Sequence, residues 1–175
     1  GILATVVLRL ASYGCGVTFD GGGIDVATYL PGWQNCASKK VCRITYDWRQ
    51  ETNGVTCVYR VKFLEDIDLQ CVGLTWWMSA GLTSGRTWQA DGMVRQAPVE
   101  FKNIGLGSGK ACRFELPLPE GRTLVAEFPD GVPYTAQDGR KWWSDKWFLR
   151  FGSELSRRIH PAGEEIVYSV RFSSP

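Results

Sequence analysis

The chain has 175 residues, 44% of them hydrophobic, which suits one domain with a sizeable core. Its 20 basic and 18 acidic residues leave a formal net charge of +2, and this balance argues against nucleic acid or an anionic membrane as a partner. No apolar run approaches the roughly 20 residues that a transmembrane helix needs.

The first half of the chain predicts strands separated by turns. Residues 2–10 alternate as a strand, and glycine-rich and proline-containing turns follow. A strand over 41–48 places Cys42, Ile44, Tyr46 and Trp48 on its buried face. The turn at 52–54 has hairpin composition and leads into a second alternating strand over 55–63. Residues 69–78 are apolar on both faces, as a central strand requires.

The second half repeats this organisation. A loop at 79–85 and a tight turn at 90–92 come first, and turns at 117–121 and 129–133 follow later. We expect strands over 99–101, 111–116, 123–128 and 146–151. The last strand is the clearest, because a Pro161-Ala162-Gly163 turn precedes a run with Ile166, Tyr168, Val170 and Phe172 on one face.

About ten short strands at spacings near 10–12 residues, with no convincing helix, predict an all-β fold. The expected architecture is an antiparallel β-sandwich of the immunoglobulin-like or elongated jelly-roll type that contains disulfides. No internal repeat and no domain boundary is visible before Ser173, so residues 1–172 form the predicted sandwich domain.

Six cysteines and a single histidine favour disulfides over a zinc site. The first expected bridge is Cys36–Cys42, because a hairpin can bring these two residues together. A Cys57–Cys71 bridge between neighbouring strands is the second, and Cys15–Cys112 follows by elimination. Six reduced core cysteines are the alternative.

The sequence predicts no catalytic unit, no metal site and no cofactor. The one histidine, His160, precedes Pro161 and is interpreted as a surface or edge residue. A glycosidase needs two carboxylates about 5–10 Å apart. Glu115 and Glu127 lie in predicted strands where they could face each other, but nothing else marks them. We therefore predict a protein that is not an enzyme.

The chain is rich in tryptophan, with eight residues of this type. Some belong to the core, but Trp142 and Trp143 lie in a polar loop beside Arg140 and Asp145, and Trp88 lies near Asp91. Sugar recognition uses an aromatic face next to polar groups that bond hydroxyls. We expect a shallow ligand surface of Trp142, Trp143 and Asp145, extended by Arg140, Trp88 and Asp91; the alternative is that these tryptophans plug the ends of the sandwich.

The turn at Pro161-Ala162-Gly163 and its alternating strand resemble the end of domains from chaperone–usher fimbriae. Together with the early cysteines and the Ser173-Ser174-Pro175 tail, the chain looks like the N-terminal lectin domain of a fimbrial tip adhesin. In this family, residues 173–175 would begin a linker to a missing C-terminal pilin domain.

The resemblance implies adhesion to a host or surface glycan or glycoprotein without catalysis. It implies a monomeric domain secreted to the bacterial surface at the fimbrial tip. A periplasmic chaperone, an usher and a neighbouring pilus subunit would be partners through the pilin domain, while nucleic acid and membrane would not. Two alternatives stay open: a secreted carbohydrate-active enzyme such as a glycoside hydrolase, or a carbohydrate-binding module; and a structural pilus subunit.

Overall fold

A computed structural model describes residues 2–10, 16–19, 24–29, 38–102, 105–140, 146–151 and 158–175. All strand pairs in it are antiparallel, which confirms the predicted all-β class. No helix in the described part of the chain is long and apolar enough to cross a membrane. The elements are β1 (Ile2–Leu10), β2 (Gly16–Phe19), β3 (Ile24–Tyr29), β4 (Ser38–Glu51), β5 (Gly54–Phe63), β6 (Ile67–Ser79), α1 (Ala80–Thr83), β7 (Thr87–Ala90), β8 (Met93–Gln96), β9 (Gly105–Pro117), η1 (Pro119–Gly121), β10 (Thr123–Asp138), β11 (Lys146–Phe151), β12 (Arg158–His160) and β13 (Glu165–Ser173).

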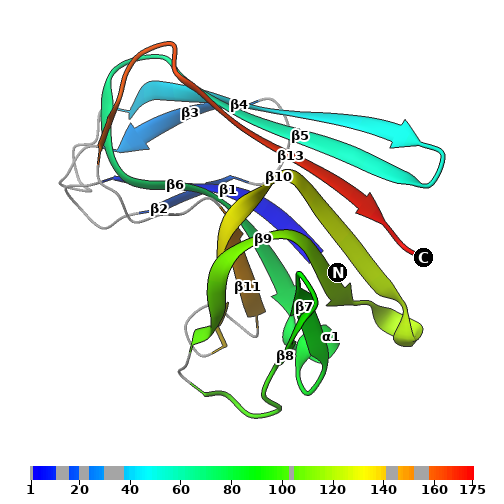
Figure 1. The fold of residues 1–175 in the computed structure, drawn as a ribbon. Coiled ribbons are helices and arrows are strands. Elements are labelled where there is room, and N and C mark those ends of the chain that lie inside the picture. Colours follow the sequence, from blue (N-terminus) through cyan, green and yellow to red (C-terminus); the bar gives the residue numbers. More distant parts are fainter. Residues whose placement is uncertain are drawn as a thin grey trace.

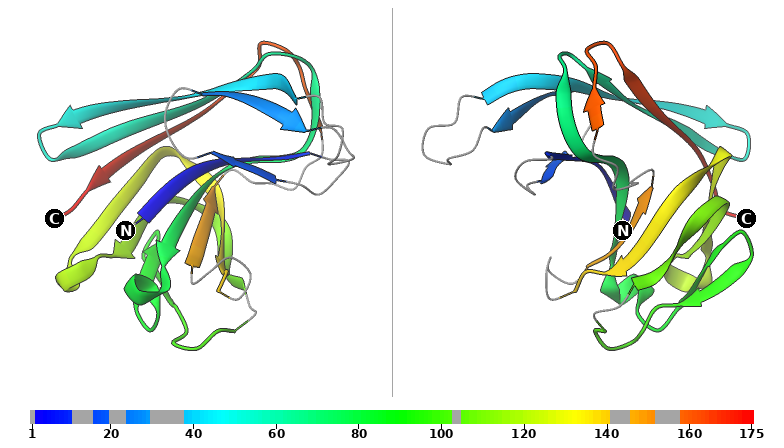
Figure 2. Two further views of the ribbon diagram at one scale, coloured as in Figure 1. Left: turned by 180° about the vertical axis from the view of Figure 1, so that it is seen from behind. Right: turned by 60° about the vertical axis from the view of Figure 1, so that its left-hand side comes forward.

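The strands form one hydrogen-bonded sheet that folds over itself. Its main path runs β2-β1-β6-β11-β10-β13-β5-β4-β3, and β9 with the β7–β8 hairpin is attached to β10. In Figures 1 and 2, the layer of β3, β4, β5 and β13 lies over β1, β2 and β6. A twisted sheet with this many strands curls in this way and thereby buries one of its faces. The two termini lie at the same end of the layers (Figure 1).

The buried faces follow the predicted alternation. In β5, Cys57, Tyr59, Val61 and Phe63 are buried, while the residues between them are more exposed. Trp76 of β6 is fully buried as well. Burial of these side chains provides the main free energy that holds the layers together.

Aromatic rings connect the layers inside the core. The ring centroid of Trp76 lies 5.3 Å from that of Phe172 in β13 and 5.8 Å from that of Phe128 in β10. Phe128 in turn contacts Phe114 of β9 edge to face, at 5.8 Å. These spacings are those of favourable aromatic pairs. The core therefore extends from β13 to the attached β9.

Trp48 departs from the prediction that it is buried. Its side chain is 57% exposed and stacks on Phe172 at a centroid distance of 6.1 Å. The reason is the length of the β4–β5 hairpin, whose tip extends beyond the layer underneath (Figure 1). The alternation correctly predicted the face on which Trp48 lies, but not where the opposite layer ends.

β10 is longer than predicted. Instead of a strand over 123–128 that ends in a turn, one strand runs to Asp138, with an irregularity between Glu127 and Val132 where it pairs with β9. Gly131 lies there with φ +66°, a conformation that glycine adopts easily. The irregularity separates the part of β10 that pairs with β13 from the part that pairs with β11. The strand expected at 99–101 is not formed.

The cysteines differ from the predicted bridges. Cys57 and Cys112 are free thiols, so the Cys57–Cys71 and Cys15–Cys112 bridges are not formed. The physical reason for the first is topology, because β5 pairs with β4 and β13 whereas β6 pairs with β1, β11 and β12. Cys42 forms no disulfide either, so the Cys36–Cys42 bridge is not formed. Cys15 and Cys36 themselves lie outside the described residues.

Candidate functional site

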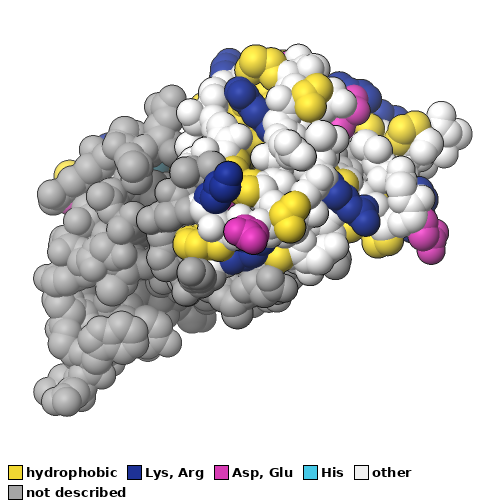
Figure 3. All heavy atoms as spheres, turned by 90° about the horizontal axis from the view of Figure 1, so that it is seen from below, with side chains coloured by type: hydrophobic (Ala, Val, Ile, Leu, Met, Phe, Trp, Pro, Cys, Tyr) yellow, Lys and Arg dark blue, Asp and Glu magenta, His cyan; other side chains and the backbone are white. Residues whose placement is uncertain are grey.

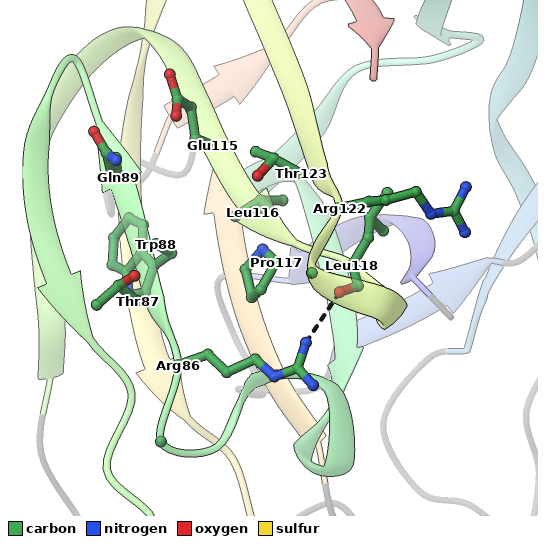
Figure 4. Close-up of a pocket in the computed structure, with 12 residues that line it drawn as sticks. Arg86, Thr87, Trp88, Gln89, Glu115, Leu116, Pro117, Leu118, Arg122 and Thr123 are labelled. Carbon is green, nitrogen blue, oxygen red and sulfur yellow. Dashed lines mark hydrogen bonds between the residues drawn. The ribbon is translucent and has the colours of Figure 1, made fainter. Parts of the chain in front are cut away.

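A pocket of about 500 Å³ lies between β7 and the β9–β10 hairpin (Figure 4). We call it the β7–β9 pocket. Its volume is within the range of small-molecule sites. The residues that line it are Gly85, Arg86, Thr87, Trp88, Gln89, Glu115, Leu116, Pro117, Leu118, Gly121, Arg122 and Thr123.

The pocket exists because two strands diverge. β7 pairs with β9 only through Gln89↔Glu115 and Ala90↔Phe114. Beyond Glu115, the β9 strand approaches Pro117, which has no N–H group to donate to β7. The β9–β10 turn then reverses the chain through Glu120 at φ 61° and Gly121 at φ 74°. The space between the separating strands is the pocket.

The floor of the pocket is apolar and its rim is polar. Trp88, 6% exposed, and the half-buried Pro117 form this floor, whereas the side chain of Leu116 is fully buried and belongs to the core. The indole of Trp88 meets the ring of Tyr134 edge to face at 6.1 Å. Gln89 and Glu115 are directly opposite each other in the sheet, and Figure 4 shows both at one end of the pocket. A floor of this kind provides apolar contact, and the rim supplies hydrogen bonds.

Arg86 lies at the other end of the pocket. Its Nη1 donates a hydrogen bond of 3.0 Å to the carbonyl oxygen of Leu118, drawn as the dashed line in Figure 4. The backbone of Arg86 is fixed as well, because its N–H donates to Thr83 and its carbonyl accepts from Ala97. The guanidinium of Arg86 is thus held across the pocket, between the β7 side and the β9–β10 turn.

The two strand carboxylates that the sequence singled out do lie near each other, but with an arginine between them. Arg113 Nε is 3.1 Å from Glu115 Oε1, and its Nη1 is 2.8 Å from Glu127 Oε1. One guanidinium thus pairs with both carboxylates.

Three of the predicted ligand residues, Trp142, Trp143 and Asp145, lie outside the described residues. Of the others, only Trp88 lines the β7–β9 pocket. Asp91 forms the β7–β8 turn, and its carboxylate accepts hydrogen bonds from the backbone N–H groups of Cys112 and Arg113. A ligand role for these residues stays a prediction.

Arg140 is held by an internal ion pair. Its Nη2 is 2.8 Å from Asp138 Oδ2, and Asp138 is fully buried. Arg140 also donates to the carbonyl oxygens of Pro98 and Val99. Burial alone would raise the pKa of Asp138, but the hydrogen bonds from Arg140 outweigh it and hold that pKa below its ordinary value. In this structure Arg140 therefore ties β10 to the segment before β9.

His160 is buried, with 4% exposure, and is not the surface or edge residue that was predicted. Its Nδ1 lies 2.9 Å from Glu164 Oε2, and its ring lies 4.6 Å from that of Phe63. Hydrogen bonds from Arg158 and then His160 outweigh burial and lower the pKa of Glu164. His160 and Arg158 line a second hollow, of about 610 Å³, beside β13 and the irregular part of β10.

Sequence reasoning did not find Arg86, Gln89 or Thr123 as pocket residues. Trp88 next to Gln89 was the available signal, because an aromatic residue beside an amide fits saccharide recognition. The rest depends on the divergence of β7 from β9, which joins segments about 30 residues apart. No periodicity in the chain predicts that divergence.

No protein-family model matches the chain. No curated protein matches its sequence. Among solved structures, the fold is similar to that of a putative aldose 1-epimerase from Escherichia coli K12, with a TM-score of 0.51. The similarity covers 99% of this chain and 84% of that one, at 8% sequence identity. It shows a shared fold.

This similarity overturns the prediction of a fimbrial tip adhesin. The features that supported the adhesin were the Pro161-Ala162-Gly163 turn and the alternating strand after it. In the structure, Gly163 has φ +87° and belongs to the turn between β12 and β13. Such a turn is common to antiparallel sheets in general, so it does not specify the family.

Proposed function

We propose that this chain is a carbohydrate-binding domain that holds a saccharide in the β7–β9 pocket. The observation that carries the proposal is the pocket itself, with an apolar floor at Trp88 and Pro117 and a polar rim of Gln89, Glu115 and Thr123. Saccharides present C–H faces and many hydroxyls, which match these two kinds of surface. The shared fold with a protein named as an aldose epimerase supports a sugar as ligand.

The rim has complementary groups for hydroxyls. Glu115 can accept hydrogen bonds, whereas the Gln89 amide can both donate and accept. Glu115 Oε1 already receives a hydrogen bond from Arg113 Nε, which fixes the orientation of the carboxylate. Fixed polar groups lose little entropy on binding and therefore favour affinity.

The test is titration calorimetry with a panel of monosaccharides and disaccharides. We expect a Gln89→Ala or Glu115→Ala variant to weaken binding about tenfold, because each loses a hydrogen bond to the ligand. Gln50→Ala is the matched control, since Gln50 bonds to backbone carbonyls at the β4–β5 hairpin, outside the pocket. Binding that is unchanged in both pocket variants would refute the assignment.

A second candidate function is enzymatic proton transfer to a sugar at His160. The observation that favours it is the 2.9 Å contact between His160 Nδ1 and Glu164, beside a hollow of about 610 Å³. A carboxylate bonded to one imidazole nitrogen leaves the other to exchange a proton with a substrate. Because the neighbour in fold is named as an aldose 1-epimerase, interconversion of sugar anomers is the reaction to assay.

The assay follows the rate of α/β anomer exchange of glucose and galactose by NMR. Acceleration that disappears in His160→Gln and survives in Gln89→Ala would establish this second function. No acceleration by the folded wild-type protein would exclude it for these two sugars.

A further inference from the structure

Arg86 has no acidic partner in the described part of the chain. Its only described side-chain hydrogen bond is to a neutral carbonyl, that of Leu118. In contrast, Arg113, Arg140, Arg158 and Arg171 each form an ion pair with a carboxylate. Arg86 is therefore a cation on a pocket rim whose charge is not compensated by a described neighbour.

The two ends of the β7–β9 pocket differ in charge. At the Gln89 end, the charge of Glu115 is balanced by Arg113 at 3.1 Å. Arg122 lines the pocket too, but its Nε has Glu120 at 4.0 Å, and in Figure 4 its guanidinium points away from Trp88. Because the charges of Glu115 and Arg122 are compensated in this way, the described side chains leave a positive charge at the Arg86 end of the pocket.

The position of Arg86 suits an anion. The bond from Nη1 to Leu118 fixes the guanidinium plane and leaves Nε–H and Nη2–H without a described acceptor. A planar fork of two such donors matches a carboxylate. Figure 3, the view from below, shows basic side chains spread among hydrophobic ones and a few acidic ones on the described part of that face.

We infer that the β7–β9 pocket binds an acidic saccharide, a hexuronate, whose carboxylate pairs with Arg86. The sugar ring then lies over the floor at Trp88 and Pro117, with hydroxyls toward Gln89 and Glu115. This inference rests on the proposed function, because it specifies the class of sugar for the same pocket. It adds that charge, and not only hydroxyl pattern, selects the ligand.

The experiment compares glucuronate with glucose, and galacturonate with galactose, by titration at low and at moderate salt. We expect each acid to bind about fivefold more tightly than its neutral parent, as for an ion pair on an accessible rim. Added salt should reduce this preference, because the Debye length shortens. Arg86→Gln should remove the preference, measured as the ratio of the affinities for the acid and for its neutral parent in the same variant.

Arg60→Gln is the matched control, since it removes one charge from β5, outside the pocket, where Arg60 faces Glu165. It should keep the preference for the acid. A thermal melt of Arg86→Gln verifies that the variant is folded.

Two outcomes overturn the inference in different ways. If acidic and neutral sugars bind equally well and Arg86→Gln changes neither, the choice of a hexuronate is wrong while carbohydrate binding stands. If neither kind of sugar binds to the folded wild-type protein, the proposed function is wrong and the inference fails with it.

Discussion

At the scale of single residues, the structure separates two tryptophans to which the sequence assigns different places, Trp48 on a buried strand face and Trp88 on a ligand surface. Trp88 is 6% exposed and packs on Tyr134, whereas Trp48 is 57% exposed. We expect Trp88→Ala to lower the free energy of unfolding by about 3 kcal/mol or more, because it leaves a cavity. Trp48→Ala should cost about 1 kcal/mol, mainly the lost stack on Phe172. Urea denaturation measures both, and equal losses would contradict the burial difference.

The cysteine thiols differ in the same way. Burial raises the pKa of Cys57 to about 11, so at pH 8 this thiol is protonated as well as inaccessible. Cys112 is exposed. We expect iodoacetamide to modify Cys112 in the native protein at pH 8 and Cys57 only after denaturation, as mass spectrometry of peptides can show. A Cys112 that reacts only after reduction would instead support the bridge predicted from the sequence.

At the scale of elements, Asp91 is expected to hold the β7–β8 hairpin on β9. Its carboxylate accepts the N–H groups of Cys112 and Arg113, at 3.0 and 2.8 Å. Asp91→Ala should therefore lower the free energy of unfolding by about 1 kcal/mol. Asp91→Asn should lose less, since asparagine keeps one acceptor oxygen and tolerates the φ of 46° at this position. An alanine variant as stable as the wild type would show that these bonds contribute nothing.

The elements that could be predicted from the sequence are those whose signal is local. Strong alternation predicted 2–10 and 146–151 with the bounds that β1 and β11 have in the structure. The turn at 90–92 predicted the hairpin centre, but β7 and β8 have four residues each and leave too little periodicity to detect. In β10, proline and glycine at 129–133 predicted an end, whereas pairing with β9 continues on both sides of Gly131. Tertiary pairing outweighed the local preference there.

At the scale of the whole molecule, the antiparallel class follows from the spacing of strands and turns, whereas the site does not. The β7–β9 pocket joins residues 85–89 with residues 115–123, and nothing local marks where β7 leaves β9. His160 shows the same limit, since its burial depends on Phe63, almost a hundred residues earlier in the chain. Residue composition suggested saccharide recognition, but only the topology identifies the residues that would perform it.

The buried Asp138–Arg140 pair should make the stability of the whole domain sensitive to acid. The folded-state pKa of Asp138 lies below its ordinary value, so the pair contributes stability above the unfolded pKa of about 4. That contribution is lost as the pH falls through this value toward the lower pKa of the folded state. We expect the free energy of unfolding to drop between about pH 5 and pH 3, and to drop less in Asp138→Asn, which is already less stable at pH 7. Glu120→Gln, whose carboxyl side chain is 83% exposed, is the control and should keep the wild-type dependence. Urea denaturation at a series of pH values measures the effect, and an Asp138→Asn curve parallel to that of the wild type would contradict it.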